Sequence, residues 1–184
     1  VGRLTVRKGL MEFVAEVLPH IVKRHPDARL VVIGDAPTDS LYAEVQTQEQ
    51  IQAAADKAGV GHCLCFLGKR FGSELSDAYF AADVHVFPIR QLPNDPEGFG
   101  LVAVEAAAHG LQTVAYSSGG VVDAVAVGVS GCLVASGHPD EFAQAVLALL
   151  AEPIPAEMIR GFAEGFSWEN FGERIKETIS DESC

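Results

Sequence analysis

The sequence predicts an α/β domain of three layers, in which helices cover both faces of a mostly parallel sheet of about six strands. Two observations carry this prediction. Short apolar runs alternate with longer segments whose apolar residues recur at helical spacing. Glycine or proline follows several of the runs, as at Gly34, Gly68 and Pro88. Strands separated by helices pair in parallel through right-handed crossovers, so we expect a Rossmann-like sheet.

The expected helices rest on apolar periodicity and on end signals. Residues 10–24 repeat apolar side chains at helical spacing until His25 and Pro26 end the segment. Ser73 is a good N-cap for a short helix that runs to Ala82. Similar patterns predict further helices over 48–58, 140–151, 156–164 and 168–180, and one more helix that begins near residue 101.

The expected strands are the short apolar runs between these helices. They are the end of a strand at Val1 and Gly2, followed by 30–33, 62–67, 83–87, 112–116 and 132–135. In a parallel sheet the loops that follow the strands gather at one edge, where α/β proteins bind their ligands.

Composition excludes several classes of protein. The net charge is −12 and the cations are scattered, which argues against a nucleic-acid surface. No apolar run approaches the length of a membrane span. The four cysteines show no metal-binding spacing, so we expect reduced thiols in a cytoplasmic protein. The length suits one domain over residues 1–184.

Residues 96–110, PEGFGLVAVEAAAHG, indicate an anion site. Turn residues pass directly into a helical pattern, so Gly98 and Gly100 lie at a helix N-terminus. The first amides of a helix have no intrahelical acceptor and carry the positive end of its dipole. A phosphate can approach such a glycine-flanked start closely.

Two carboxylates flank this site, Glu97 in the turn and Glu105 in the helix. Like charges repel, so we expect both to accept hydrogen bonds from hydroxyl groups attached to the phosphate. This arrangement suits a nucleotide sugar. The alternative is a solvated loop residue at Glu97 and a salt-bridged helix residue at Glu105. Glu105 stands alone among valines and alanines, however, and such a residue needs a partner or a ligand.

Two common nucleotide fingerprints are absent from the sequence. It contains neither the dinucleotide pattern Gly-x-Gly-x-x-Gly nor a phosphate loop that ends in Gly-Lys-Ser/Thr. Both absences lower the likelihood of a dehydrogenase or an NTPase.

A set of short motifs runs in order along nearly the whole chain. It comprises Val1-Gly2-Arg3-Leu4, Val32-Ile33-Gly34-Asp35, Phe66-Leu67-Gly68, Glu97-Gly98-Phe99-Gly100 with Glu105-Ala106, Gly119-Gly120 and Phe166-Ser167-Trp168. In these motifs the chain resembles the C-terminal, donor-binding domain of the retaining glycosyltransferases of the GT-B fold, family 4.

The resemblance implies a role for each matching residue. The catalytic residues would be Arg3, Lys8 and Glu97. Arg3 and Lys8 would neutralise the donor diphosphate, and Glu97 would contact the transferred sugar. Taken singly, Arg3 and Lys8 also fit two solvated loop cations. The substrate-binding residues would be Gly98, Phe99, Gly100 and Leu101 for the distal phosphate, Glu105 for the ribose, and Gly34, Lys69 and Arg70 near the base.

The resemblance also implies the reaction. A hexose would pass from a UDP- or GDP-linked donor to a glycan or lipid-linked acceptor, with retention and with no metal or other cofactor. No two Asp residues stand two positions apart, so the Asp-any-Asp metal motif is missing. The leaving diphosphate would then be stabilised by cations and helix amides.

A GT-B enzyme has two such domains, so the resemblance implies an N-terminal acceptor domain that residues 1–184 do not contain. This half would bind the donor without turnover, and residues 166–184 would form a tail that packs on the other domain. Membrane contact, at the inner face, would come only through that domain. Two alternatives stay open, an NAD-linked or epimerase-type Rossmann enzyme and a non-catalytic nucleotide-binding domain.

Overall fold

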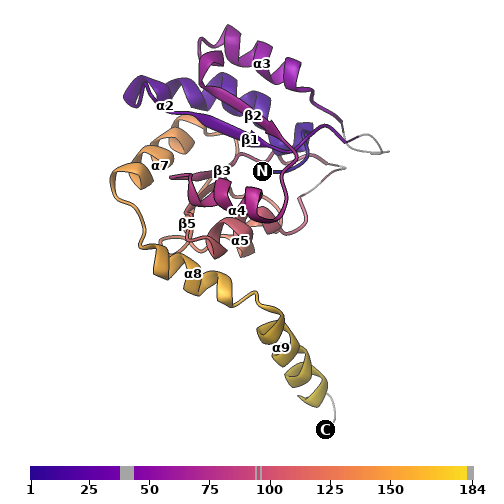
Figure 1. Cartoon of the computed structure of the whole chain (residues 1–184). Coiled ribbons are helices and arrows are strands. Elements are labelled where there is room, and N and C mark those ends of the chain that lie inside the picture. Colours follow the sequence, from indigo (N-terminus) through magenta and orange to yellow (C-terminus); the bar gives the residue numbers. More distant parts are fainter. Residues whose placement is uncertain (38–43, 94, 96, 182–184) are drawn as a thin grey trace.

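The chain folds as alternating strands and helices, in a computed structural model that describes residues 1–37, 44–93, 95 and 97–181 (Figure 1). Pro96, at the start of the predicted anion motif, and residues 182–184 of the predicted tail lie outside the described residues. The strands of the described part are β1 (Leu30–Ile33), β2 (Leu64–Gly68), β3 (His85–Phe87), β4 (Thr113–Tyr116) and β5 (Gly131–Val134).

All pairing between these strands is parallel, as predicted. β1 pairs with β2, and β4 lies between β3 and β5. The prediction of about six strands is wrong, because the described residues form five. The discrepancy lies at Val1 and Gly2, which are not a strand. Gly2 N–H donates to Ile33 O at 2.8 Å and Leu4 N–H to Asp35 O at 3.0 Å, so this segment bonds to the end of β1 without forming a strand.

The first helical run contains an irregular turn. Residues 10–24 are helical throughout, as predicted, and divide into α1 (Leu10–Glu12), the π-helical η2 (Phe13–Val17) and α2 (Leu18–Arg24). Pro19 lies in the first turn of α2 and has no N–H to donate to the preceding turn, which accounts for the wider turn before it.

The other predicted helices agree with the structure to within a few residues. They are α3 (Gln48–Lys57), α4 (Gly72–Phe80), α5 (Leu101–Ala108), α7 (Pro139–Ala151), α8 (Ala156–Glu164) and α9 (Trp168–Asp181). The structure adds a short helix that the sequence did not predict, α6 (Val121–Ala124), and two 3-10 turns, η1 (Val6–Lys8) and η3 (Gly61–Cys63). Ser73 is not the N-cap of α4. Phe71 holds that position, and the helix begins at Gly72, two residues earlier than an N-cap at Ser73 would give.

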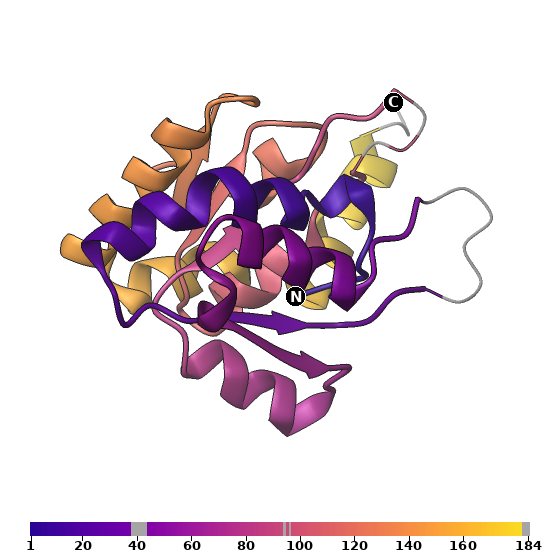
Figure 2. The ribbon, with the colours of Figure 1, turned by 90° about the horizontal axis from the view of Figure 1, so that it is seen from above.

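Helices cover both faces of the strands. The run α1–α2 lies between α3 and α7 on one face, which Figure 2 shows from above. Its largest buried side chains include Phe13 and Phe142, whose rings meet edge to face at 5.7 Å. On the opposite face α4 and α5 pack together through Tyr79, Ala106 and Leu111. This is the three-layer arrangement that the sequence predicts.

The chain ends in two further helices. α8 packs on α5, and α9 runs away from the rest of the domain (Figure 1). Within the described residues, no single helix is long and apolar enough to cross a membrane. One pair, Pro139–Ala151 with Ala156–Glu173, satisfies that test by length and composition only, and it is bent by 114°.

Candidate functional site

The carboxyl ends of the parallel strands carry the predicted site residues. Gly34 follows β1 directly, and Lys69 and Arg70 follow β2. The chain after β3 leads through Glu97 to the N-terminus of α5. Because the strands run in one direction, the turns that follow them lie at the same edge of the fold, where α/β proteins place ligands.

Glu97 lies at the centre of a cluster of ion pairs. Its Oε2 accepts a hydrogen bond from Lys8 Nζ at 2.9 Å and lies 3.2 Å from Arg7 Nε. Arg7 also donates through its NH1 nitrogen to Asp95 Oδ1 at 2.7 Å. The side chains of Arg7, Lys8 and Glu97 are only 12%, 16% and 11% exposed. Removing one partner would therefore leave a largely buried charge without compensation.

Lys8 is electrostatically under-compensated. Its Nζ lies 4.7 Å from the centre of the Phe87 ring, within the range of a cation–π contact. Burial lowers the pKa of Lys8, the bond to Glu97 raises it in part, and the charges of Arg7 and Arg3 lower it again. A further anion beside Lys8 would stabilise its charged form.

The Glu97–Gly100 turn is fixed by close backbone packing. Gly100 has a φ of 85°, and a Cβ there would lie 2.8 Å from Phe87 Cε1. The turn also rests on Gly119 and Gly120, which follow β4. A Cβ at Gly119 would lie 2.6 Å from Glu97 O, and one at Gly120 would overlap Gly98 O. Glycine at these positions allows the two turns to touch.

Gly100 is the N-cap of α5, as the anion motif predicts. Leu101, the first residue of the helix, has an exposed side chain. Phe99 is half-buried, and its ring lies 5.5 Å from that of Phe166. The first N–H groups of α5 have no acceptor in their own helix and carry the positive end of its dipole. This helix start directly follows the Glu97 cluster in the chain.

Glu105 has a different environment from Glu97. It is exposed, and its Oε2 accepts a hydrogen bond from the Tyr79 hydroxyl at 3.0 Å. Burial, followed by the charge of Glu105, raises the pKa of Tyr79 far above its usual range, so the phenol stays a neutral donor. His109 stacks on Tyr79 at 4.9 Å, and its Nε2 lies 2.8 Å from Ser76 Oγ. These contacts hold α4 and α5 together beneath Glu105.

The remaining predicted residues lie nearer to β1 and β2. Gly34 has a φ of 129° and passes so close to Gly2 that a Cβ would overlap Gly2 O. Lys69 is exposed, and Arg70 contacts Glu74 at 4.0 Å. Arg3 is exposed and, among the described ion pairs, contacts neither carboxylate of the cluster. The structure thus brings Lys8 and Glu97 together and leaves Arg3 outside that contact.

Sequence reasoning missed three contributors to this region, Arg7, Asp95 and Tyr79. Arg7 belongs to the same cationic loop as Arg3 and Lys8, so the sequence showed its charge but not that its side chain points toward Glu97. Asp95 and Tyr79 carry no motif, and only the fold brings them to Arg7 and Glu105. Within the part of the chain that the structure describes, no group of three or more His, Cys, Asp or Glu could hold a metal ion.

Comparison with known proteins identifies the family. The sequence profile described as glycosyl transferases group 1 matches residues 1–152. The chain is 35% identical to a D-inositol 3-phosphate glycosyltransferase of Corynebacterium jeikeium, over 95% of this chain and 41% of that protein. It is 32% identical to a GDP-mannose-dependent alpha-(1-6)-phosphatidylinositol monomannoside mannosyltransferase of Mycolicibacterium smegmatis, over 97% of this chain and 46% of that protein.

Solved structures show the same fold. A sucrose-phosphate synthase of Thermosynechococcus elongatus superposes with a TM-score of 0.78 at 27% identity, covering 98% of this chain and 44% of that one. The C-terminal domain of a glycosyl transferase group 1 family protein of Francisella tularensis superposes with a TM-score of 0.66 at 26% identity, covering 89% of this chain and 77% of that one.

The chain spans less than half the length of the curated relatives described above, and it corresponds to the C-terminal half of its GT-B structural neighbours. The parallel strands, the glycine turns and the motif from Glu97 to Glu105 are the features that it was expected to share with them. This chain therefore belongs to the glycosyl transferases group 1 family.

Proposed function

We propose that the intact protein is a retaining glycosyltransferase and that this chain forms its donor-binding domain, which takes a UDP- or GDP-linked hexose. One observation carries the proposal. Lys8 and Arg7 converge on Glu97, which directly precedes the glycine turn that leads to the N-cap of α5, so two largely buried cations contact the chain segment that enters this helix start. This combination suits a diphosphate better than any uncharged ligand.

Binding of the donor would exchange partners within the cluster. Burial already lowers the pKa of Lys8, and its one carboxylate partner is shared with Arg7. A diphosphate oxygen beside Lys8 would supply the missing negative charge. Glu97 would then be released from Lys8 to accept a hydroxyl of the transferred sugar, while Asp95 still holds Arg7. Arg3, exposed in the same loop, would reach the diphosphate from solvent.

Glu105 would hold the ribose. Its carboxylate is exposed and accepts one hydrogen bond from Tyr79, a neutral donor that leaves its negative charge in place. Side chains of a helix tilt toward the N-terminus, so Glu105 leans toward the amides of Leu101 and its neighbours. The loops with Gly34, Lys69 and Arg70 would surround the base.

Transfer would proceed without a metal and without a protein nucleophile. The charge that develops on the leaving diphosphate would be stabilised by Lys8, Arg7, Arg3 and the α5 amides. Attack on the face from which the diphosphate departs would give retention, with the leaving phosphate taking the proton of the acceptor. A hexose donor is supported by the GDP-mannose-dependent relative, which is a mannosyltransferase.

The test is calorimetric titration of the domain with UDP, GDP, ADP and NAD in turn. We expect UDP or GDP to bind, and Glu105→Ala to lose about 10-fold or more of that affinity, since a charge-assisted bond to a ribose hydroxyl contributes roughly 1.5–3 kcal/mol. Glu157→Ala is the matched control, because Glu157 is an exposed glutamate in the first turn of α8 and lies far from the site in the chain.

The outcomes separate the candidate functions. Binding of NAD alone would show an NAD-linked or epimerase-type enzyme instead. Nucleotide binding by the domain, combined with undiminished function of the intact protein carrying Glu97→Ala, would favour a non-catalytic nucleotide-binding domain. Sugar transfer by the intact protein, lost in Glu97→Ala while UDP or GDP still binds, would support the proposal.

A further inference from the structure

Arg7 contacts both ends of the segment that leads from β3 to Glu97. At the near end, Arg90 N–H donates to Arg7 O at 2.7 Å. At the far end, the NH1 nitrogen of Arg7 donates to Asp95 Oδ1 at 2.7 Å, and Arg7 Nε lies 3.2 Å from Glu97 Oε2. One residue of the loop before α1 therefore fixes where this segment begins and where it ends.

Further contacts hold the near end of the segment in place. Ile89 is buried and packs with residues of α5 and α6. A Cβ at Gly9 would overlap Pro88 O, so the loop before α1 lies directly against the start of the segment. Arg90 also forms an ion pair with Glu12 of α1. The cationic loop and the segment are thus packed together before any ligand arrives.

Asp95 gives Arg7 a carboxylate that Lys8 does not share. Among the described ion pairs, Lys8 contacts Glu97, whereas Arg7 contacts Glu97 and Asp95. The side chains of Arg7 and Asp95 are 12% and 23% exposed, so a charge-assisted bond between them is largely shielded from water. Two carboxylates therefore hold Arg7, and one holds Lys8.

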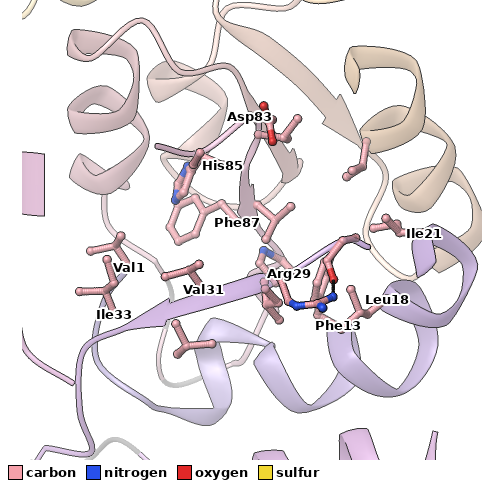
Figure 3. A pocket seen from close by; sticks show the side chains of 18 of the residues that line it. Val1, Phe13, Leu18, Ile21, Arg29, Val31, Ile33, Asp83, His85 and Phe87 are labelled. Carbon is pink, nitrogen blue, oxygen red and sulfur yellow. Dashed lines mark hydrogen bonds between the residues drawn. The ribbon is translucent and has the colours of Figure 1, made fainter. Parts of the chain in front are cut away.

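Lys8 has an aromatic ring beside it in place of a second carboxylate. Its Nζ lies 4.7 Å from the centre of the Phe87 ring. Figure 3 shows this ring across from Val31 and Ile33, at a cavity of about 790 Å³ between β1 and β3. A new anion would therefore draw Lys8 away from its carboxylate more readily than it would draw Arg7.

We propose that Asp95 is a positioning residue for sugar transfer. By holding Arg7, it keeps one cation on Glu97 after the donor diphosphate has taken Lys8, so that Glu97 stays directed at the transferred sugar. Both described cation contacts of Glu97 fall on Oε2, so Oε1 would accept the sugar hydroxyl. The inference rests on the proposed function and adds to it a residue that acts through Arg7 without touching the donor.

The loss of Asp95 should change two affinities differently. Without Asp95, Arg7 would turn toward the diphosphate together with Lys8, and one negative charge would leave the site. The nucleotide diphosphate would then bind as tightly as before or more tightly, whereas the sugar would lose the oriented carboxylate of Glu97. A residue that only stabilised the segment would weaken both affinities when it is removed.

The test is calorimetric titration of the intact protein with UDP and UDP-glucose, and with GDP and GDP-mannose, in the wild type and in Asp95→Asn. We expect the affinity for the nucleotide diphosphate to stay equal or to rise, by up to about 5-fold. The ratio of sugar-donor affinity to nucleotide affinity should fall by about 3-fold or more. In a Glu97→Gln background Asp95→Asn should leave this ratio unchanged, because the two residues act on the sugar as a unit.

Asp27→Asn is the matched control. Asp27 is exposed between α2 and β1, at the amino ends of the strands, so the same charge is lost at the edge opposite the site and neither affinity should change. A fall of both affinities by the same factor in Asp95→Asn would overturn the inference, because it would show a structural role.

Two further outcomes separate this inference from the proposed function. Nucleotide binding with an unchanged ratio in Asp95→Asn, or with an equal fall of the ratio in the Glu97→Gln background, would contradict the inference alone. A wild-type protein that binds neither UDP nor GDP would contradict the proposed function and the inference together.

Discussion

Glu97 and Glu105 flank the same helix start, yet the fold gives them opposite environments. Glu97 is largely buried and is engaged by Lys8 and Arg7. Glu105 is exposed, and its described side-chain hydrogen bond comes from the neutral hydroxyl of Tyr79. The first carboxylate is shared between two cations, and the second has no cation among the ion pairs of the described residues and is open to solvent.

The difference predicts which carboxylate contributes more to the stability of the fold and which is more accessible to a ligand before binding. A buried carboxylate between two cations can be removed only at the cost of leaving those cations unpaired. An exposed carboxylate contributes little to folding, because water solvates it in both states. We therefore expect substitution at Glu97 to affect stability and substitution at Glu105 to affect binding.

The largest expected effect is the loss of stability in Glu97→Ala. It leaves Lys8 without a carboxylate, and we expect about 2–3 kcal/mol of destabilisation, at the low end for a buried pair since each side chain retains some contact with water. Glu105→Ala should cost less than about 1 kcal/mol. Urea denaturation of both variants checks this. Equal losses would abolish the distinction between the two sites.

Gly100→Ala tests whether backbone packing positions the turn between the two glutamates. A Cβ at Gly100 would meet Phe87 Cε1 at 2.8 Å on a backbone with a φ of 85°, so we expect a loss of about 1–3 kcal/mol. Gly98→Ala is the matched control, because no atom lies within 4 Å of its added Cβ. Thermal unfolding of the two variants should separate them, and a Gly100→Ala variant as stable as Gly98→Ala would show that the turn adapts.

Acid should lower the free energy of unfolding through His85, a buried residue whose aromatic neighbours contact Lys8 and Glu105. The ring of His85 stacks on that of Phe87, and the Phe87 ring in turn contacts the Lys8 ammonium group. His85 also lies edge to face with Tyr79, whose hydroxyl donates to Glu105. Burial lowers the pKa of His85 well below its ordinary 6.5. As the pH falls below 6.5 the unfolded chain takes up a proton that the folded chain does not, so stability is lost, by up to about 1.4 kcal/mol per pH unit.

The measurement is the pH dependence of the free energy of unfolding between pH 7 and pH 5, compared between the wild-type protein and His85→Asn. His25→Asn serves as the control, since His25 is exposed at the end of α2. An unchanged slope in His85→Asn would contradict the assignment, because the proton uptake would then belong to another group.

The smallest expected effect is that of Tyr79→Phe. It removes the hydroxyl that donates to Glu105 and leaves the packing of the ring on His109, so we expect about 0.5 kcal/mol of destabilisation, because water can replace the hydroxyl at the exposed carboxylate. Glu105 would lose the hydrogen bond that orients it, and affinity for UDP or GDP should fall by a few-fold. Calorimetry on the variant measures this, and affinity at the wild-type level would show that Tyr79 does not position Glu105.

Local patterns in the sequence were sufficient for most of the fold. Apolar runs such as Leu30–Ile33 and the periodic residues 10–24 identify a strand and a helix, because the side-chain period of each element is a local property. The glycines around Phe99 likewise indicate the N-terminus of α5, since only glycine accepts a left-handed backbone beside Phe87. The sixth strand was overcounted at Val1 and Gly2, where the chain bonds to the end of β1 but does not form a strand.

What the sequence by itself determined is thus the type and order of most elements, the parallel pairing, and the placing of Glu97 and Glu105 around the start of a helix. Only the tertiary structure decided that Arg7, rather than Arg3, joins Glu97, that Tyr79 supports Glu105, and that a cavity lies between β1 and β3. The reason is physical. These contacts join residues far apart in the chain, and their direction depends on how turns and helices pack, which no local period records.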